Sequence, residues 1–232
     1  MLKVSLICTF LLTTLLCFGQ KEHLEPAKEF NPNDSTRYGS YYSKIKEYNA
    51  NLNKLLYSGF SQKPYARYTC NPSFRAEHAF SVEKINGKNY IILNKFSEYY
   101  WYALVDNRQN SVKLNTKKTE IKNELYLKIG KLFELLVGQA REKERKFETL
   151  PDGTIVEHIE IGADGETYDF TTTDKNGEIR TGTTWSPHPS NKPLLSRLVK
   201  ICNDLCLLGI ENDISQTNIL REIDILINDF KK

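Results

Sequence analysis

The stretch His78–Lys95 (HAFSVEKINGKNYIILNK) specifies an antiparallel hairpin together with its register, and the other elements can be placed around it. Asn86-Gly87 at its centre is typical of a type I′ turn, in which both central residues need positive φ. A slip of one residue would move every side chain to the other face, so the apolar pattern selects one register. That register pairs Ile85 with Lys88, Val82 with Ile91, Phe80 with Leu93, Glu83 with Tyr90 and Ala79 with Asn94.

Further strands are expected after this hairpin. Tyr99–Val105 (YYWYALV) is apolar on both faces, which predicts a third strand in the centre of the sheet, and a shorter strand is expected near Val112–Thr116. Asp164-Gly165 and Asn176-Gly177 predict two more hairpins with two-residue loops. These turns would join Ile155–Gly162, Glu166–Thr173 and Glu178–Trp185 into a three-stranded meander.

The predicted loops also set the faces of this meander. A two-residue loop at Asn176-Gly177 pairs Lys175 with Glu178. One face then carries Ile161, Tyr168 and Trp185, with Ile159, Phe170 and Thr183 beside them.

Apolar residues at helical spacing predict helices before, between and after the two β segments. The N-terminal helix is expected from residue 34 or 35 to 57, and the long central helix from Thr116 or Thr119 to about Phe147. Two C-terminal helices are expected at 194–208 and 216–230, the second capped by Ser215. The central helix has the apolar stripe Ile121, Leu125, Ile129, Leu132, Leu136 and Ala140.

Together these elements predict an α+β fold. An antiparallel sheet built from hairpins and meanders would be packed by the long central helix, the N-terminal helix and the two C-terminal helices. We expect a flexible mature N-terminus at 20–33 and one globular domain at 34–232. The alternative division is two packed subdomains, 34–118 and 119–232.

The first nineteen residues predict export from the cytoplasm. Lys3 precedes the apolar run Val4–Phe18, whose helix would rise about 22 Å, less than the roughly 30 Å of a bilayer core. A cut after Gly19 would leave Gln20 as the first mature residue. We therefore expect a periplasmic or extracellular protein with no transmembrane segment in its mature form.

Cysteine positions leave two questions open. Lipid anchoring through Cys17 is the alternative to release, although Leu16 is not the small residue that a lipoprotein signal needs there. Cys70, Cys202 and Cys206 remain after cleavage, so a disulfide of Cys70 with Cys202 or Cys206 is a candidate in an oxidising compartment. The other interpretation is that all three are small buried side chains.

Composition and motifs give no reason to expect nucleic acid or a cofactor, and they do not identify another partner. The chain is 40% hydrophobic and 11% aromatic, as globular proteins are. Its formal net charge of +3 falls to +2 when Lys3 leaves with the signal, which gives no reason to expect nucleic acid. The nucleotide-binding, zinc-protease and nucleophile-elbow motifs are absent from the sequence, and no cofactor is expected.

One local cluster of titratable residues is predicted on the outer face of the meander. The register places Glu160 opposite Asp169, with His158 two residues away on the same face. Two carboxylates can hold a cation, and with a histidine they can perform acid–base chemistry. The alternative is a solvent-exposed face without a functional role, on which water screens the two like charges.

Two further histidines have simpler interpretations. His78 is expected at the edge of the core, on the apolar face of the first hairpin. His188 lies between two prolines and is expected on an exposed loop.

The densest aromatic run is the candidate ligand-binding surface. It consists of Tyr99, Tyr100, Trp101 and Tyr102. Alternate rings of a strand point to opposite faces, so solvent-facing rings could stack on a sugar or a peptide. The alternative is a central strand whose rings are all packed in the core.

The composition of the mature chain and two stretches resemble a group of bacterial proteins. The mature chain is rich in Lys, Asn, Ile and Tyr, and the stretches are Pro72–Asn94 and Thr116–Leu136. They are similar to parts of uncharacterised exported proteins of Bacteroidota, a resemblance that implies location and no activity.

The leading functional hypothesis is therefore an exported, non-enzymatic binding or interaction module for a protein, peptide or glycan. The competing hypothesis is a small hydrolase or cation-dependent enzyme that uses His158, Glu160 and Asp169.

Overall fold

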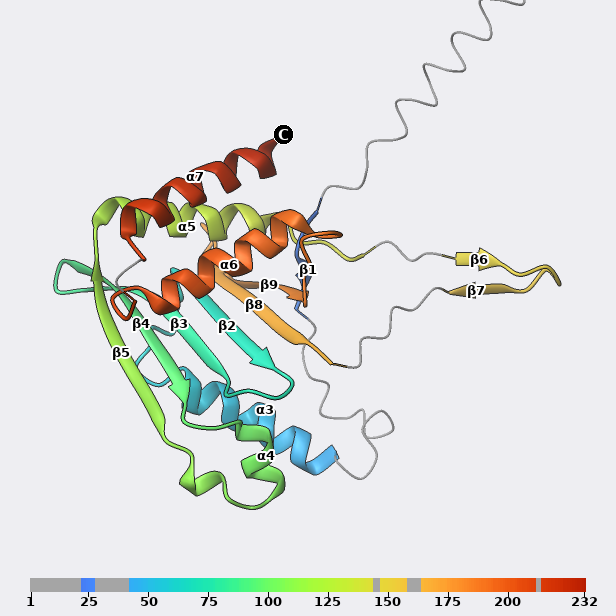
Figure 1. Cartoon of the computed structure of the whole chain (residues 1–232), viewed down its shortest axis with the longest axis horizontal. Helices are drawn as coiled ribbons and strands as arrows, with labels where there is room; N and C mark the ends of the chain where they lie inside the picture. Colours follow the sequence, from blue (N-terminus) through green and yellow to red (C-terminus); the bar gives the residue numbers. More distant parts are fainter. Residues whose placement is uncertain (1–21, 28–41, 144–146, 158–163, 212–213) are drawn as a thin grey trace, which may run out of the picture.

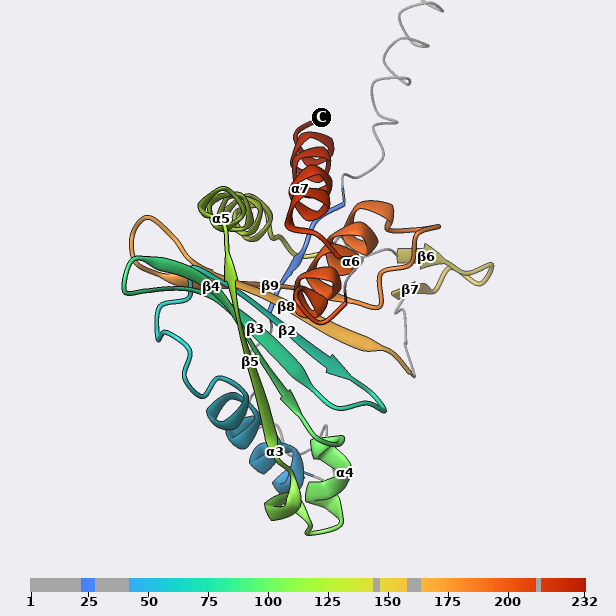
Figure 2. The ribbon, with the colours of Figure 1, turned by 60° about the vertical axis from the view of Figure 1, so that its left-hand side comes forward.

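The computed structural model describes residues 22–27, 42–143, 147–157, 164–211 and 214–232. Within them the chain forms a seven-stranded antiparallel sheet with helices on both faces (Figures 1 and 2). The predicted α+β class is confirmed. None of the helices in these ranges is both long and apolar enough to cross a bilayer.

The sheet has the strand order β1-β9-β8-β2-β3-β4-β5. Its central ladder joins β2 to β8, two segments about a hundred residues apart in the sequence. The strands are β1 (Glu25–Pro26), β2 (Ala66–Pro72), β3 (His78–Ile85), β4 (Lys88–Phe96), β5 (Leu114–Ile121), β8 (Glu166–Thr173) and β9 (Ile179–Trp185).

The hairpin β3–β4 has the predicted register in every pair. Asn86 and Gly87 have φ values of 50° and 80°, as the type I′ turn requires. Val82 faces Ile91 and Phe80 faces Leu93. His78 pairs with Lys95 and lies near the ring of Tyr68, at the core edge as predicted.

One face of the sheet is covered by α5 (Asn123–Gly138) and α6 (Pro193–Leu207), with α7 (Gln216–Lys231) packed on both (Figure 2). The apolar stripe predicted for the central helix is buried in this layer, apart from the partly buried Ala140. Both C-terminal helices form as predicted. The Ser215 side chain accepts a hydrogen bond from the Asn218 N–H, which confirms the predicted cap.

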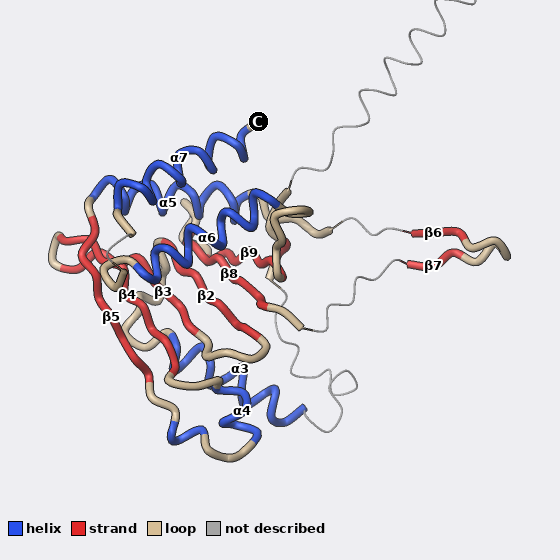
Figure 3. Tube along the Cα trace, viewed as in Figure 1, coloured by secondary structure: helices blue, strands red, loops and turns tan. Residues whose placement is uncertain are grey.

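The opposite face is covered by α3 (Tyr42–Leu56) and α4 (Tyr100–Val105), as Figure 3 shows. This second, smaller core joins the two helices to β3 and β4. Its buried members are Leu52, Leu56, Phe60, Ala79, Ile92, Phe96 and Tyr100.

The predicted third strand at Tyr99–Val105 is wrong, because this segment is the helix α4. Tyr100, Ala103 and Leu104 are its buried residues, and their i, i+3, i+4 spacing suits a helix as well as an apolar strand. The segment after α4, which includes the 3₁₀ turn η2 (Gln109–Ser111), leads into β5.

The predicted start and end of the central helix are also wrong. Residues 114–121 form β5, which pairs with β4 from Phe96↔Leu114 to Asn89↔Ile121. The helix α5 begins at Asn123 and ends at Gly138. Hydrogen bonds to β4 therefore overrode the helical apolar pattern around Ile121, whose side chain joins the same core from the strand.

The predicted three-stranded meander is replaced by the hairpin β8–β9. Both edges of β8 are paired, one with β2 and one with β9. Residues 158–162 of the predicted first strand lie outside the described residues, and its described part, 155–157, does not pair with β8. Instead β7 (Ile155–Glu157) pairs with β6 (Phe147–Thr149) in a separate two-stranded sheet.

The register of β8–β9 differs by one residue from the prediction. The loop has three residues, because the Asp174 carboxylate accepts the N–H groups of Asn176 (2.9 Å) and Glu178 (3.0 Å). Gly177 completes the loop with a φ of 84°. Trp185 consequently pairs with Thr167 and lies on the opposite face from Tyr168.

Residues 22–27 correct the expectation of a flexible terminus at 20–33. Glu25 and Pro26 form β1 on β9, and the Leu24 side chain is fully buried in the larger core. A Cβ on Gly182 would lie 2.8 Å from the Leu24 side chain, so the glycine leaves the space that Leu24 fills. The other residues of 20–33 lie outside the described residues, as does the predicted signal peptide 1–19. The β2–β8 ladder also crosses the 118/119 boundary of the alternative division into two subdomains.

We predict that Leu24→Ala destabilises the mature protein by about 2–5 kcal/mol, the cost of emptying a buried leucine site. Leu127→Ala is the matched control, because Leu127 is 53% exposed on α5. Urea unfolding of the two variants measures the difference. Equal midpoints for Leu24→Ala and the unmodified protein would mean that this segment contributes nothing to the fold.

Candidate functional site

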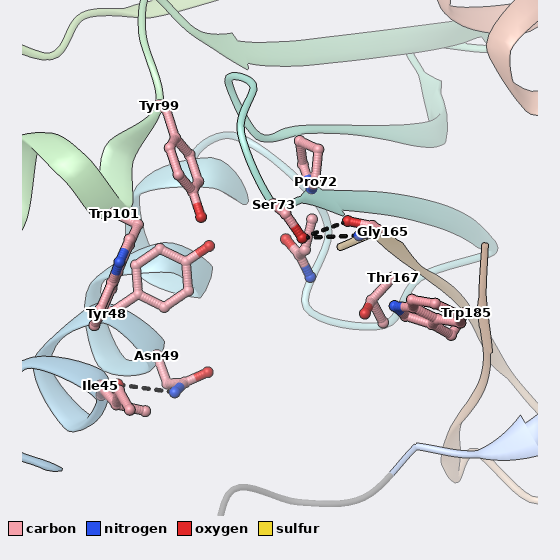
Figure 4. A pocket seen from close by; sticks show the side chains of 11 residues that line it. Ile45, Tyr48, Asn49, Pro72, Ser73, Tyr99, Trp101, Gly165, Thr167 and Trp185 are labelled. Carbon is pink, nitrogen blue, oxygen red and sulfur yellow. Dashed lines mark hydrogen bonds between the residues drawn. The ribbon is translucent and has the colours of Figure 1, made fainter. Parts of the chain in front are cut away.

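A cleft of about 310 Å³ lies between the α3–α4 layer and one end of the sheet (Figure 4). The sheet side is formed by the ends of β2 and β9 and the start of β8. The helix side carries Tyr48, Tyr99 and Trp101, and the rings of Trp185 and of these three residues border the space between the two sides.

The sheet side of the cleft is a row of three cross-strand neighbours. Asn71 pairs with Thr167, and Thr167 pairs with Trp185. Residues directly opposite one another in antiparallel strands share a face, so the three side chains lie side by side on the face that α3 and α4 cover. The β2–β8 ladder therefore places an amide, a hydroxyl and an indole on one wall.

Hydrogen bonds between Gly165 and Ser73 fix the backbone beside this wall. The Ser73 hydroxyl donates to the Gly165 carbonyl oxygen at 2.6 Å, and the Gly165 N–H donates back to Ser73 Oγ at 3.1 Å. A Cβ at position 165 would lie 2.5 Å from the indole of Trp185. The glycine thus lets the Trp185 ring lie against the backbone, with 46% of the residue exposed.

The helix side of the cleft is aromatic. Tyr48 and Trp101 make an edge-to-face contact with their ring centroids 5.5 Å apart. Tyr99 lies just before the first turn of α4, and the centroid of its ring is 4.8 Å from that of the Tyr102 ring. Such contacts restrict the rings and stabilise them by roughly 0.5–1.5 kcal/mol per pair.

The Glu77 carboxylate connects α3 to α4 behind these rings. Glu77 is fully buried, accepts the Tyr48 hydroxyl at 2.9 Å and accepts the Tyr100 N–H at 2.9 Å. Burial raises the pKa of Glu77, and its hydrogen bonds partly oppose that rise. The carboxylate positions Tyr48 and the first turn of α4 with respect to each other.

Every described residue that lines the cleft is uncharged. Among the described residues that line it, the polar groups are amides, hydroxyls and an indole N–H, with no carboxylate, ammonium or guanidinium. Asn71 Oδ1 is buried and has no hydrogen-bond partner in the described part of the chain. A buried acceptor without a donor is costly, so this atom suits a ligand N–H or O–H.

The structure divides the predicted aromatic surface. Tyr99 and Trp101 line the cleft, Tyr100 is buried against Phe96 and Tyr48, and Tyr102 is 49% exposed outside the cleft. Tyr99 has extended backbone just before α4 and Trp101 lies in the first turn, so both reach the cleft from the start of this helix.

Four residues of the site carry no signal of that role in the sequence. Strands and helices that are distant in sequence bring them together, and no local motif marks any of them. They are Tyr48, Asn71, Glu77 and Trp185.

Of the predicted titratable cluster, Asp169 is the one member in the described part of the chain. Asp169 lies one row behind the cleft, between Thr69 and Thr183, and burial raises its pKa while a hydrogen bond with Thr183 opposes the rise. His158 and Glu160 themselves lie outside the described residues. In the ranges that the structure covers, no group of three or more His, Cys, Asp or Glu residues could hold a metal ion.

The predicted disulfide is not formed. Cys70, Cys202 and Cys206 are all buried free thiols. Burial raises the pKa of the Cys70 thiol to about 12 and raises that of the other two as well. The interpretation of these cysteines as small core side chains is confirmed.

Two further histidines lie away from the cleft. Burial, with Lys95 nearby, lowers the pKa of His78 to about 4, so the imidazole is neutral in the core edge at pH 7. His188 is exposed and bonds Ser190 at 2.8 Å, as the loop prediction implies.

Comparisons of the chain with protein-family models, with curated proteins and with solved structures return no significant match. The function is therefore inferred from the geometry of the cleft.

We predict that Glu77→Gln changes the pH dependence of stability. A raised pKa means that the folded protein disfavours the charged carboxylate, so the stability that Glu77 contributes falls as pH rises from about 4.3 through its raised pKa. Tyr48, Tyr99, Tyr100 and Cys70 around it have raised pKa values and stay neutral below pH 8.

Urea unfolding of both proteins between pH 4 and pH 8 measures this effect. As the pH rises from about 4.3 to the raised pKa of Glu77, the free energy of unfolding of the unmodified protein should fall relative to that of Glu77→Gln. Above that pKa the difference between the two proteins should stay constant. A constant difference at every pH would contradict the raised pKa.

Proposed function

We propose that this chain is an exported binding protein whose binding site is the aromatic cleft. The observation that carries the proposal is the convergence of four aromatic rings, from α3, the start of α4 and β9, around a space whose described lining is uncharged. Asn71 also lines this space and has a buried, unpartnered acceptor in its Oδ1. Small-molecule sites have this composition: an apolar and aromatic lining with a few placed polar groups. A volume of about 310 Å³ suits a small ligand or one end of a longer one.

The lining favours binding over catalysis. General acid–base chemistry needs a group that exchanges a proton near neutral pH, and the described lining residues include no His, Asp, Glu, Lys or Cys. The Ser73 hydroxyl is engaged with Gly165, and the Tyr48 hydroxyl donates to Glu77 with its pKa raised by burial. The side chains in the cleft can therefore hold and orient a ligand.

Export is supported by the N-terminal sequence. A basic residue, a short apolar run and a small residue at the expected cut describe a cleaved signal. Buried free thiols agree with either a reducing or an oxidising compartment, because solvent and oxidants reach them poorly.

We predict that the mature protein purified from a Gram-negative host begins at Gln20. Intact mass and N-terminal peptide mass measure this directly. A diacylglyceryl group on Cys17 would replace the soluble form by a lipoprotein, and a full-length N-terminus would contradict processing.

The two tryptophans provide a direct test of the cleft. The chain contains two Trp residues, and both line the cleft, so intrinsic tryptophan fluorescence reports on its occupancy. The mature protein would be titrated with neutral probes: methyl glycosides and oligosaccharides, nucleosides, and dipeptides with blocked termini. We expect at least one class to change the emission and to raise the melting temperature.

Variants locate any binding that is found. Trp185→Ala should weaken it by about tenfold or more, since a lost ring contact and its buried area are worth at least ~1.4 kcal/mol. Tyr102→Ala is the matched control, because Tyr102 lies on α4 outside the cleft. If a probe binds without changing the emission, and Trp185→Ala does not change its affinity, the ligand site lies elsewhere and the proposal is wrong. The proposal is also wrong if none of the probes binds.

A further inference from the structure

The side chains on the two walls of the cleft also indicate which class of ligand it would bind. We infer that the cleft takes a neutral saccharide, with the C–H face of a sugar ring on the Trp185 indole and a hydroxyl donating to Asn71 Oδ1. This inference rests on the proposed function, since it names the ligand of the same cleft.

The absence of charge in the lining favours a neutral ligand. The described lining residues offer no cation for a phosphate, sulfate or carboxylate and no anion for an amine. A charged ligand group would lose part of its hydration in the cleft without gaining a partner of opposite charge, which is unfavourable. The buried Glu77 carboxylate behind the helix wall is already occupied by Tyr48 and Tyr100. The ligand should therefore be neutral, which excludes nucleotides and acidic sugars.

The polar groups of the cleft match those of a sugar. Asn71 Oδ1 needs a donor, whereas the Thr167 hydroxyl can both donate and accept. Asn49 uses its Nδ2 on the Ile45 carbonyl at 2.8 Å, which orients its amide. Sugar hydroxyls donate and accept at short spacing along one ring edge, so they match a wall that mixes an unpaired acceptor with a hydroxyl.

The aromatic rings provide surfaces on which a sugar ring can stack. The Trp185 indole lies near Gly165 and beside Thr167 on the sheet side of the cleft, and the residue is about half exposed (Figure 4). A pyranose has an apolar C–H face that buries well on such a ring, and its edge leaves hydroxyls free to reach Asn71. Tyr48 and Trp101 border the far side of the space, where they can cover a second sugar unit.

The pairing of the strands favours a sugar over a peptide. Extended peptides are usually bound by adding a strand to a free sheet edge, where backbone hydrogen bonds provide affinity. At the cleft β8 is paired on both edges, with β2 and β9, so no strand can be added beside Thr167. Asn71 and Trp185 are each paired on one edge only, but the side chains of all three residues lie on one face of the sheet. Ring stacking and side-chain hydrogen bonds on this face favour a saccharide over a peptide backbone.

The test is a titration of the mature protein with neutral saccharides, in which tryptophan fluorescence and calorimetry measure binding. The probes are methyl α- and β-glucosides, galactosides and mannosides, maltose, cellobiose and oligomers of N-acetylglucosamine. We expect at least one to bind, with little change in affinity between low salt and about 0.5 M NaCl because a neutral ligand is not screened.

Three variants examine the two contacts. Asn71→Ala should weaken binding by about tenfold, the effect of one lost buried hydrogen bond, while Asn115→Ala on the exposed edge strand β5 should not. Gly165→Ala keeps the indole but forces it to move, so it should also weaken binding. Circular dichroism of each variant confirms that the fold is intact, and Gly165→Ala keeps the test valid if Asn71→Ala does not fold.

The outcomes distinguish this inference from the proposed function. Saccharide binding that depends on Asn71 and Gly165 supports both. If blocked dipeptides or nucleosides bind with that dependence and no saccharide does, the cleft is a binding site and the saccharide inference is wrong. If saccharides bind but Asn71→Ala and Gly165→Ala leave the affinity unchanged, the assignment to this cleft is wrong. If no probe of any class binds, both are wrong.

Discussion

The ladder between β2 and β8 holds the two halves of the chain together in one sheet. It joins two segments about a hundred residues apart and occupies the centre of the seven strands. On one face it brings Tyr68 beside Phe170 in the core under α5 and α6. On the other face the same pairing places Asn71 beside Thr167 at the cleft. One set of backbone hydrogen bonds thus builds both the larger core and one wall of the candidate site.

The two walls of the cleft are held by different interactions. The sheet wall is held by the ladders that pair β8 with β2 on one edge and with β9 on the other. The helix wall depends on the short helix α4 and on Glu77, a buried carboxylate that satisfies Tyr48 and the Tyr100 N–H. Removing such a buried acceptor leaves two unsatisfied donors. A wall held by backbone pairing therefore faces a wall held by apolar packing and one buried carboxylate.

Part of the fold could be predicted because it depends on neighbours in the sequence. The β3–β4 register follows from Asn86-Gly87 and the apolar alternation around it, and Ser215 with the helical spacing after it marks α7. The site could be predicted only in part. The aromatic run drew attention to Tyr99 and Trp101, but as residues of a strand. Tyr48, Asn71 and Trp185 carry no local signal of their role, since each is a common residue in an ordinary helix or strand.

Local sequence was enough to specify the α+β class, the hairpin β3–β4, the apolar stripe of α5 and the two C-terminal helices, because turn residues and apolar periodicity act over a few residues. The partners of β8, the strand β5 and the helix α4 emerged only from the folded chain, because they depend on hydrogen bonds and burial between distant segments. The face of Trp185 shows the limit most clearly. The Asp174 side chain selects a three-residue loop instead of two, and this single residue of register moves the indole from the core face to the cleft.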